Sequence, residues 1–206
     1  MVSEIRLYVE GGGDQSHTKA IFRKGFSLFL NDLVNIARGK RIRWSIIACG
    51  TRNHTYDNFL TALESHQNAF NVLLVDSEGL VSNSPCKYLS EHDNWILNRE
   101  LIDNCHLMVQ IMESWLVADV STLKSFYGQN FNENAIPRNS DVEMINKDDV
   151  KSSLKRATRN TTKGEYHKIR HGPELLGQLN ISKIRQASNH CDRLFNTLAS
   201  VMEASM

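Results

Sequence analysis

The chain has few cysteines, few prolines and no long uninterrupted apolar run. Its 206 residues include 3 prolines and 4 cysteines, and the cysteines form no Cys-x-x-Cys pair: Cys49, Cys86, Cys105 and Cys191. Spacing this wide argues against a structural zinc site and predicts reduced thiols in a core. No apolar stretch approaches the roughly 20 residues that a membrane span requires. The opening sequence MVSEIRLYVE lacks the apolar segment of a signal peptide, so we expect a cytoplasmic protein without membrane contact.

Charge of either sign is also not in excess. Lys and Arg number 24 against 23 Asp and Glu, which gives a formal net charge of +1. The overall charge therefore neither favours nor excludes a nucleic-acid partner, and only local charge can decide. Apolar residues make up 41% of the chain, enough to build the core of one domain with a small appendage.

Short apolar segments alternate with helical patterns in the first part of the chain. The segments predict four strands, at residues 5–10, 43–50, 71–78 and 106–112. They are continuous apolar runs more than a clean alternation of apolar and polar residues, which is typical of strands that are covered on both faces of the sheet. Apolar residues at helical spacing predict helices over 15–38, 54–66 and 115–128. This order predicts an α/β fold, a mostly parallel sheet flanked by helices.

The pattern changes after residue 128, where loops and short helices follow. We expect helices at 148–157, 173–178 and 181–187, and a closing helix at 191–204. The chain is therefore divided into an α/β core, residues 1–128, and a basic loop and helical extension, residues 129–206, that packs on the core.

The stretch YVEGGGDQS, residues 8–16, ends a predicted strand on Glu10 and continues with three glycines. Two interpretations compete. The glycines can cradle a phosphate, or they can clear space around Glu10 for a metal ion and a phosphodiester. The P-loop pattern is absent, and the dinucleotide fingerprint lacks its last glycine and an acid after the second strand. The sequence therefore favours access to Glu10.

Two further acids follow the third predicted strand in LLVDSEG. Asp76 and Glu78 stand two positions apart, which in a strand puts both carboxylates on one side. Parallel strands bind ligands beyond their carboxyl ends, and Glu10 joins this edge if its strand is a neighbour. Three carboxylates about 5 Å apart repel by roughly 3 kcal/mol per pair, and a divalent cation removes the repulsion. Oxygen ligands favour Mg²⁺ or Mn²⁺. The alternative is that these acids only cap a helix or begin a turn.

Other polar residues extend this candidate site. Glu113 follows the fourth predicted strand and is either a fourth acid or a helix-start glutamate favoured by the helix dipole. Asp14 is either a metal ligand or a helix cap. Residues 151–171 hold seven Lys or Arg and one acid, so they are either a phosphate-binding face or a solvated basic surface. The predicted phosphate contacts are Lys163, Lys168 and Arg170. Two histidines are candidates for proton transfer or for structural roles: His171 and His190.

A strand that closes on Glu-Gly-x-x-Asp, with a later strand closing on two acids one residue apart, resembles the TOPRIM fold. This fold occurs in topoisomerases, primases and overcoming-lysogenization-type nucleases, and residues 5–14 and 72–79 carry the resemblance. The whole chain also resembles a family of small TOPRIM-like proteins of unknown function, often encoded beside an ABC/AAA-type ATPase in bacterial defence loci. The resemblance to this family of small proteins rests on five sequence segments: VEGGGD, LLVDSEG, HLMVQIMESWLVAD, KGEYHKIRHG and ASNHCDRLF.

The resemblance implies a Rossmann-like sheet and a nuclease that needs Mg²⁺ or Mn²⁺ and cleaves DNA or RNA. Glu10 would take the place of the first-motif glutamate, and Asp76 and Glu78 the places of the paired acids. It also implies an antiviral defence effector that a partner ATPase controls. The usual pair is Asp-x-Asp, and the longer side chain of Glu78 departs from it. Two rivals remain. One is a non-catalytic interaction subunit that binds the ATPase or nucleic acid, and the other is a small-molecule phosphotransfer or nucleotide-binding protein on a flavodoxin-like sheet.

Overall fold

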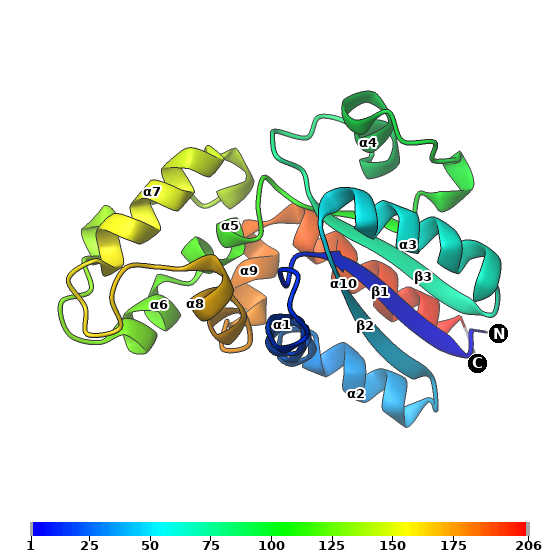
Figure 1. The fold of residues 1–206 in the computed structure, drawn as a ribbon, viewed down its shortest axis with the longest axis horizontal. Coiled ribbons are helices and arrows are strands. Elements are labelled where there is room, and N and C mark those ends of the chain that lie inside the picture. Colours follow the sequence, from blue (N-terminus) through cyan, green and yellow to red (C-terminus); the bar gives the residue numbers. More distant parts are fainter. Residues whose placement is uncertain (1, 205–206) are drawn as a thin grey trace.

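Four parallel strands form the centre of the protein, in a computed structural model that describes residues 2–204. They are β1 (Glu4–Glu10), β2 (Arg43–Gly50), β3 (Ala69–Asp76) and β4 (Cys105–Met108), in the spatial order β2-β1-β3-β4. All three pairings are parallel. Helices cover both faces of the sheet, so the predicted α/β, Rossmann-like architecture is confirmed (Figure 1).

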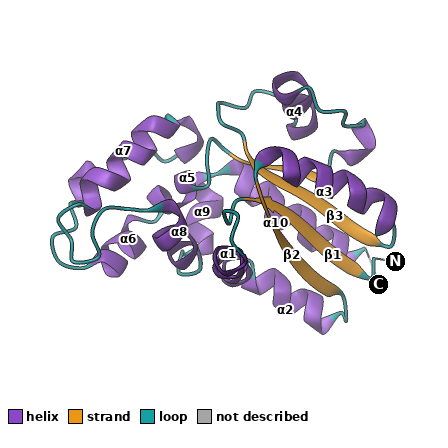
Figure 2. Cartoon of the chain, viewed as in Figure 1, coloured by secondary structure: helices purple, strands orange, loops and turns teal. Residues whose placement is uncertain are grey.

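Side-chain alternation along β1 supplies both faces of the sheet. Ile5, Leu7 and Val9 enter one apolar cluster with α1 (Ser16–Phe29), α2 (Asn31–Gly39) and α10 (Asn189–Glu203). Tyr8 points the other way and packs with α3 (Arg52–Ser65) and α4 (Pro85–Asp93). These strand residues are at most 4% exposed, and their burial stabilises each by about 1.5–3 kcal/mol. The period-2 pattern therefore sets which helices lie on which face (Figure 2).

Five short helices form a lobe beyond the carboxyl ends of the strands (Figure 1). They are α5 (Glu113–Ala118), α6 (Val120–Tyr127), α7 (Lys147–Thr158), α8 (Lys168–Leu176) and α9 (Ile181–Ala187). Single 3-10 turns occur at Arg99–Leu101, Glu133–Ala135 and Val142–Met144. The chain then returns to the sheet, where α10 packs against α2 and β4. The division at residue 128 remains a prediction, but α10 and the strands share one apolar cluster.

The predicted fourth strand, residues 106–112, is wrong beyond Met108. There the chain bends across the end of β3: the backbone N–H of Ser77 donates to Met108 O at 3.0 Å, and that of Glu78 donates to Gln110 O at 2.7 Å. Residues 109–112 are all buried, so this apolar run reflects burial and not an extended strand. The predicted helices 15–38 and 115–128 are each two helices, joined at Leu30 and at Asp119.

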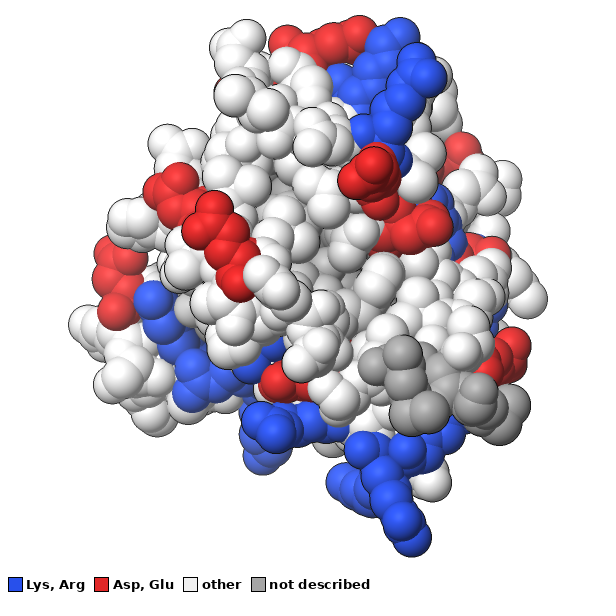
Figure 3. Space-filling view, turned by 90° about the vertical axis from the view of Figure 1, so that its right-hand side faces the viewer, with Lys and Arg blue, Asp and Glu red and all other residues white. Residues whose placement is uncertain are grey.

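The four cysteines are buried free thiols, as their spacing predicts. Within residues 2–204, every helix is too short or too polar to cross a membrane. Figure 3 shows the end of the molecule that carries the chain termini, where Lys and Arg side chains gather along the lower edge. Three exposed arginines lie in and beside the turn between α2 and β2: Arg38, Arg41 and Arg43. This basic surface lies at the opposite end from the acids described next.

Candidate functional site

Glu10 and Asp76 meet at the carboxyl edge of the sheet. Each is the last residue of its strand, and β1 and β3 are neighbours. A carboxylate oxygen of Glu10, Oε2, accepts a hydrogen bond of 3.3 Å from the backbone N–H of Asp76. Asp76 is only 3% exposed, and its Oδ1 accepts a hydrogen bond of 2.8 Å from the backbone N–H of Met112. Parallel pairing therefore brings together two acids that lie 66 positions apart.

Glu113 and Lys168 complete a group that we call the acid cluster: Glu10, Asp76, Glu113 and Lys168. Glu113 begins α5 and is 2% exposed. The ammonium nitrogen of Lys168 lies 3.3 Å from Asp76 Oδ2 and 3.5 Å from Glu113 Oε2. The hydroxyl of Tyr166 donates to Glu113 Oε1 at 3.2 Å. Among residues 2–204, the buried Oε2 of Glu113 accepts no hydrogen bond, and its ion pair is with the Lys168 ammonium.

Burial and like charge shape the protonation of this cluster. Burial raises the pKa of Asp76 to about 7, and the charges of Glu113 and Glu10 add to the rise while Lys168 opposes it. Burial also raises the pKa of Glu10, against the opposing charge of Arg52. Desolvation works against the Lys168 ammonium, but the charges of Asp76 and Glu113 raise its pKa above the ordinary value. The cluster therefore holds a charged lysine between acids, and one of these acids, Asp76, is partly protonated near neutral pH.

Arg52 supports the other side of the cluster, and sequence reasoning missed it. It is the first residue of α3 and binds both carboxylate oxygens of Asp93, each at 2.7 Å. The same guanidinium donates to Glu10 Oε2 at 3.1 Å and to the backbone carbonyl of Asp76. A signal was present, because Arg52 stands two residues after the last residue of β2 in ACGTR and so lies at the same edge of the sheet. Its fixed fork of donors holds Glu10 in place.

The prediction that strand alternation puts Glu78 on the same face as Asp76 is wrong, and the role of Glu78 as a metal ligand remains a prediction. The strand ends at Asp76, and Glu78 has a φ of 61°, outside extended backbone. Alternation of side chains holds only within a strand. Glu78 Oε2 instead pairs with the ammonium of Lys147 at 2.7 Å. Partial burial acts in the opposite direction, but the hydrogen bond and charge of Lys147 lower the pKa of Glu78.

Lys163 and Arg170 have their partners away from the acids, whereas Asp14 lies beside Gly50, the β2 neighbour of Glu10. Asp14 is exposed at the turn before α1. The Lys163 ammonium lies 4.5 Å from the ring centroid of Phe126, and Arg170 donates through Nε to the His171 ring at 2.9 Å. Within residues 2–204, no hydrogen bond or ion pair joins Asp14, Lys163 or Arg170 to the acid cluster. Of the predicted phosphate contacts, only Lys168 lies at the acids.

The two candidate histidines have partners elsewhere. His171 is buried between Tyr127 and Arg170. The hydroxyl oxygen of Tyr127 lies 2.9 Å from Nδ1 of His171. Burial first, then the charge of Arg170, lowers the pKa of His171 to about 4, so it is neutral at physiological pH. His190 Nδ1 lies 2.9 Å from Glu143 Oε2, and its backbone N–H donates to the same carboxylate. These contacts favour structural roles over proton transfer.

The three glycines after Glu10 bend the chain and support an aromatic ring. Gly11, Gly12 and Gly13 have φ values of 122°, 87° and 65°, and residues other than glycine rarely adopt these backbone angles. A Cβ on Gly11 would lie 2.8 Å from Cζ of Phe22. The turn therefore needs glycine both for its backbone and for the ring of Phe22 that packs on it.

The donor set suits a hard divalent cation, but Lys168 now lies among the acids. Within residues 2–204, no three His, Cys, Asp or Glu side chains are arranged to hold a metal ion. The Lys168 ammonium lies between Asp76 and Glu113. Carboxylate oxygens are the ligands that Mg²⁺ and Mn²⁺ prefer, and Glu113 Oε2 is buried without a hydrogen bond. Binding of Mg²⁺ or Mn²⁺ at these acids therefore remains a prediction, and it requires the Lys168 side chain to move aside.

Comparison with known proteins finds one family. The model of a domain of unknown function, DUF4276, matches residues 9–199, which include every member of the acid cluster. No curated protein and no solved structure matches the chain.

Proposed function

The chain belongs to the DUF4276 family, and we propose that it is a metal-dependent nuclease that hydrolyses phosphodiester bonds of DNA or RNA. The observation that carries the proposal is the buried acid cluster, in which three carboxylates from separate segments converge around Lys168. It lies at the carboxyl edge of a parallel sheet, where α/β proteins bind ligands. The TOPRIM resemblance of the sequence points to two of the same acids, Glu10 and Asp76.

Glu10, Asp76 and Glu113 would hold Mg²⁺ or Mn²⁺. When bound, such an ion polarises a phosphoryl oxygen and stabilises the charge that builds in the transition state. Glu78 enters the ligand set only if its ion pair with Lys147 opens.

The side chains of the cluster suit the remaining steps of hydrolysis. Water attacks phosphorus, one P–O bond breaks, and the leaving oxygen takes up a proton from solvent. Glu10 either holds the ion or accepts the proton of the attacking water, and Arg52 holds its carboxylate in position. Lys168, released from the acids, donates hydrogen bonds to a non-bridging phosphate oxygen. Each role uses a group already at the carboxyl edge.

The wider setting of this activity rests on the family resemblance of the sequence. That resemblance supports a role in antiviral defence under the control of a partner ABC/AAA-type ATPase, and we propose a cytoplasmic location because the sequence carries no signal-peptide pattern. This control explains why the isolated fold can keep its acids paired with Lys168 and Arg52 until a partner or substrate arrives.

Cleavage assays test the proposal directly. Purified protein is incubated with plasmid DNA, tRNA and single-stranded oligonucleotides, with Mg²⁺, Mn²⁺ or EDTA. We expect cleavage that needs the metal and that Glu10→Gln or Asp76→Asn abolishes. Asp14→Asn, an exposed acid near the same turn, is the matched control and should cleave as the wild type does. Circular dichroism confirms that each variant folds.

A non-catalytic interaction subunit is the second candidate, and one observation favours it. Lys168 and Arg52 already compensate the acids, so the cluster can serve as a purely structural ion-pair network. Binding of nucleic acid or of the ATPase without cleavage, under every metal and with the partner present, would establish this second function and exclude the nuclease.

A further inference from the structure

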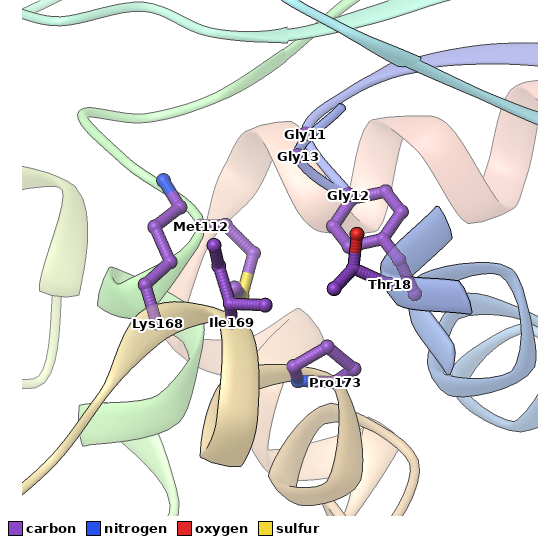
Figure 4. Close-up of a pocket in the computed structure, with 9 residues that line it drawn as sticks. Gly11, Gly12, Gly13, Thr18, Met112, Lys168, Ile169 and Pro173 are labelled. Atoms are coloured by element: carbon purple, nitrogen blue, oxygen red, sulfur yellow. The ribbon is translucent and has the colours of Figure 1, made fainter. Parts of the chain in front are cut away.

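A small apolar pocket opens beside the acid cluster (Figure 4). Residues 11–13 form one side, and Phe22, Met112, Ile169 and Pro173 form most of the remainder. Its volume is about 190 Å³. Sites for whole small ligands usually measure about 300–1,000 Å³, so this pocket fits one group of a larger ligand.

Lys168 belongs to both the pocket and the acid cluster. It lines the pocket, and its ammonium contacts Asp76 and Glu113. Figure 4 shows its side chain beside those of Met112 and Ile169. A ligand that places a phosphate at Lys168 therefore brings its adjoining group to the pocket. In a nucleic acid, the group joined to a phosphate through one sugar is a nucleobase.

The chemistry of the walls suits a flat ring with polar edges. The ring of Phe22 and the thioether of Met112 offer the contacts that aromatic ligands favour. Polar groups are also present, because Thr18, Gly12 and Gly13 line the pocket. The Thr18 hydroxyl donates to Gln15 O at 2.9 Å and keeps its capacity to accept a hydrogen bond.

The pocket is built from rigid elements. Gly25 lets α1 approach α8 so closely that a Cβ there would collide with the backbone carbonyl of Pro173. Pro173 and Phe22 therefore keep a fixed separation, and the turn of residues 11–13 is held by Phe22. A preformed pocket binds its ligand without the cost of ordering its walls.

We propose that this pocket binds one unstacked nucleobase next to the phosphate at the acid cluster, so that the substrate is single-stranded nucleic acid. The inference rests on the proposed function and adds the substrate class to it. In a duplex, the base is paired and stacked, and it enters a pocket only after extrusion. Unpaired strands present their bases freely to apolar and aromatic side chains. Ile169 and Lys168, adjacent in α8, would contact the base and the phosphate of one nucleotide.

Binding measurements test the pocket without requiring cleavage. Fluorescence anisotropy compares a single-stranded oligonucleotide with its duplex, using Glu10→Gln protein in Mg²⁺. Adding Ile169→Trp fills the pocket from a position that is 44% exposed. We expect this change to weaken single-strand binding on the order of tenfold and to leave duplex binding unchanged. Ile36→Trp, on α2 and 41% exposed, is the matched control and should change neither.

An abasic scan locates the base. One abasic nucleotide is moved along a single-stranded substrate of the wild-type enzyme, and cleavage should fall on the order of tenfold at a single position beside the cut. If the strand is cut but neither the scan nor Ile169→Trp has an effect, the pocket inference is overturned and the nuclease stands. If nothing is cut, the proposed function fails, and the anisotropy contrast still decides whether the pocket binds a base.

Discussion

Replacing Asp76 by asparagine tests whether burial of the acid cluster costs stability. Burial raises the pKa of Asp76 to about 7, whereas an aspartate in an unfolded chain titrates near 3.9. Between these values the folded protein keeps a proton that the unfolded chain has released. Because the unfolded state binds fewer protons, the free energy of unfolding falls as the pH rises from about 4 to about 7.

The size of this loss follows from the two pKa values. Between pH 5 and pH 8, the titration of Asp76 should remove roughly 2.5 kcal/mol of stability. Asp76→Asn cannot titrate, and its amide oxygen can still accept the hydrogen bond from Met112. The stability of the variant relative to the wild type should therefore rise between pH 5 and pH 8. At pH 8 the variant is either closer in stability to the wild type than at pH 5 or more stable than the wild type.

Urea denaturation at pH 5, 6, 7 and 8, with EDTA present, gives the free energies of unfolding. Histidines such as His171, whose burial and Arg170 neighbour lower the pKa to about 4, act in the opposite sense, with stability rising as the pH rises. They are present in both proteins, so the difference between the two curves isolates Asp76. Asp57→Asn, exposed on α3, should follow the wild-type curve. Parallel curves for the wild type and Asp76→Asn would refute the reasoning.

Three further substitutions probe the surroundings of the acid cluster. Lys168→Met leaves buried carboxylates without their cation, so it should cost about 2–3 kcal/mol in EDTA at pH 8, less than a fully buried pair because the lysine is half-exposed. Mg²⁺ should then raise its melting temperature more than that of the wild type, and equal shifts would show that lysine and metal do not compete. Glu78→Gln breaks a partly exposed ion pair with Lys147, so urea denaturation should show that the free energy of unfolding falls by about 0.5–1 kcal/mol. Cleavage of nucleic acid should survive this change. If cleavage is lost as completely as in Glu10→Gln, Glu78 is a metal ligand after all. In Gly11→Ala, the new Cβ is strained by the φ of 122° and lies too close to the ring of Phe22. Thermal denaturation should therefore show that the free energy of unfolding falls by about 1–3 kcal/mol. An unchanged melting temperature would contradict the need for glycine at this position.

Local patterns predicted the sheet and the end of each strand that matters. The apolar run that contains Tyr8 and Val9 is a buried strand, and an acid that terminates such a run must lie at the carboxyl edge. Glu10 and Asp76 could therefore be paired from the sequence, since parallel neighbours end side by side. Glu78 could not, because the backbone leaves the extended conformation after Asp76, and its φ of 61° follows from a turn that the chain beyond β4 completes.

The contacts of the basic residues 151–171 also could not be predicted from the sequence. Their composition suggested phosphate contacts, but composition cannot say which side chain faces the acids. Lys168 does so because Gly25 lets α8 lie tightly against α1, while Lys163 and Arg170 turn to Phe126 and His171. Arg52 was visible at the end of β2, yet its partners Glu10 and Asp93 come from segments 42 and 41 positions away.

By itself, the amino-acid sequence determined the parallel sheet, the edge that carries the acids and the glycine turn beside them. These depend on periodicity and on strand ends, which neighbouring residues encode. Only the tertiary structure decided that Lys168 lies between Asp76 and Glu113, that Glu78 pairs with Lys147, and that a pocket adjoins the cluster. Those contacts join segments that helix packing brings together, and packing depends on shape across the whole core.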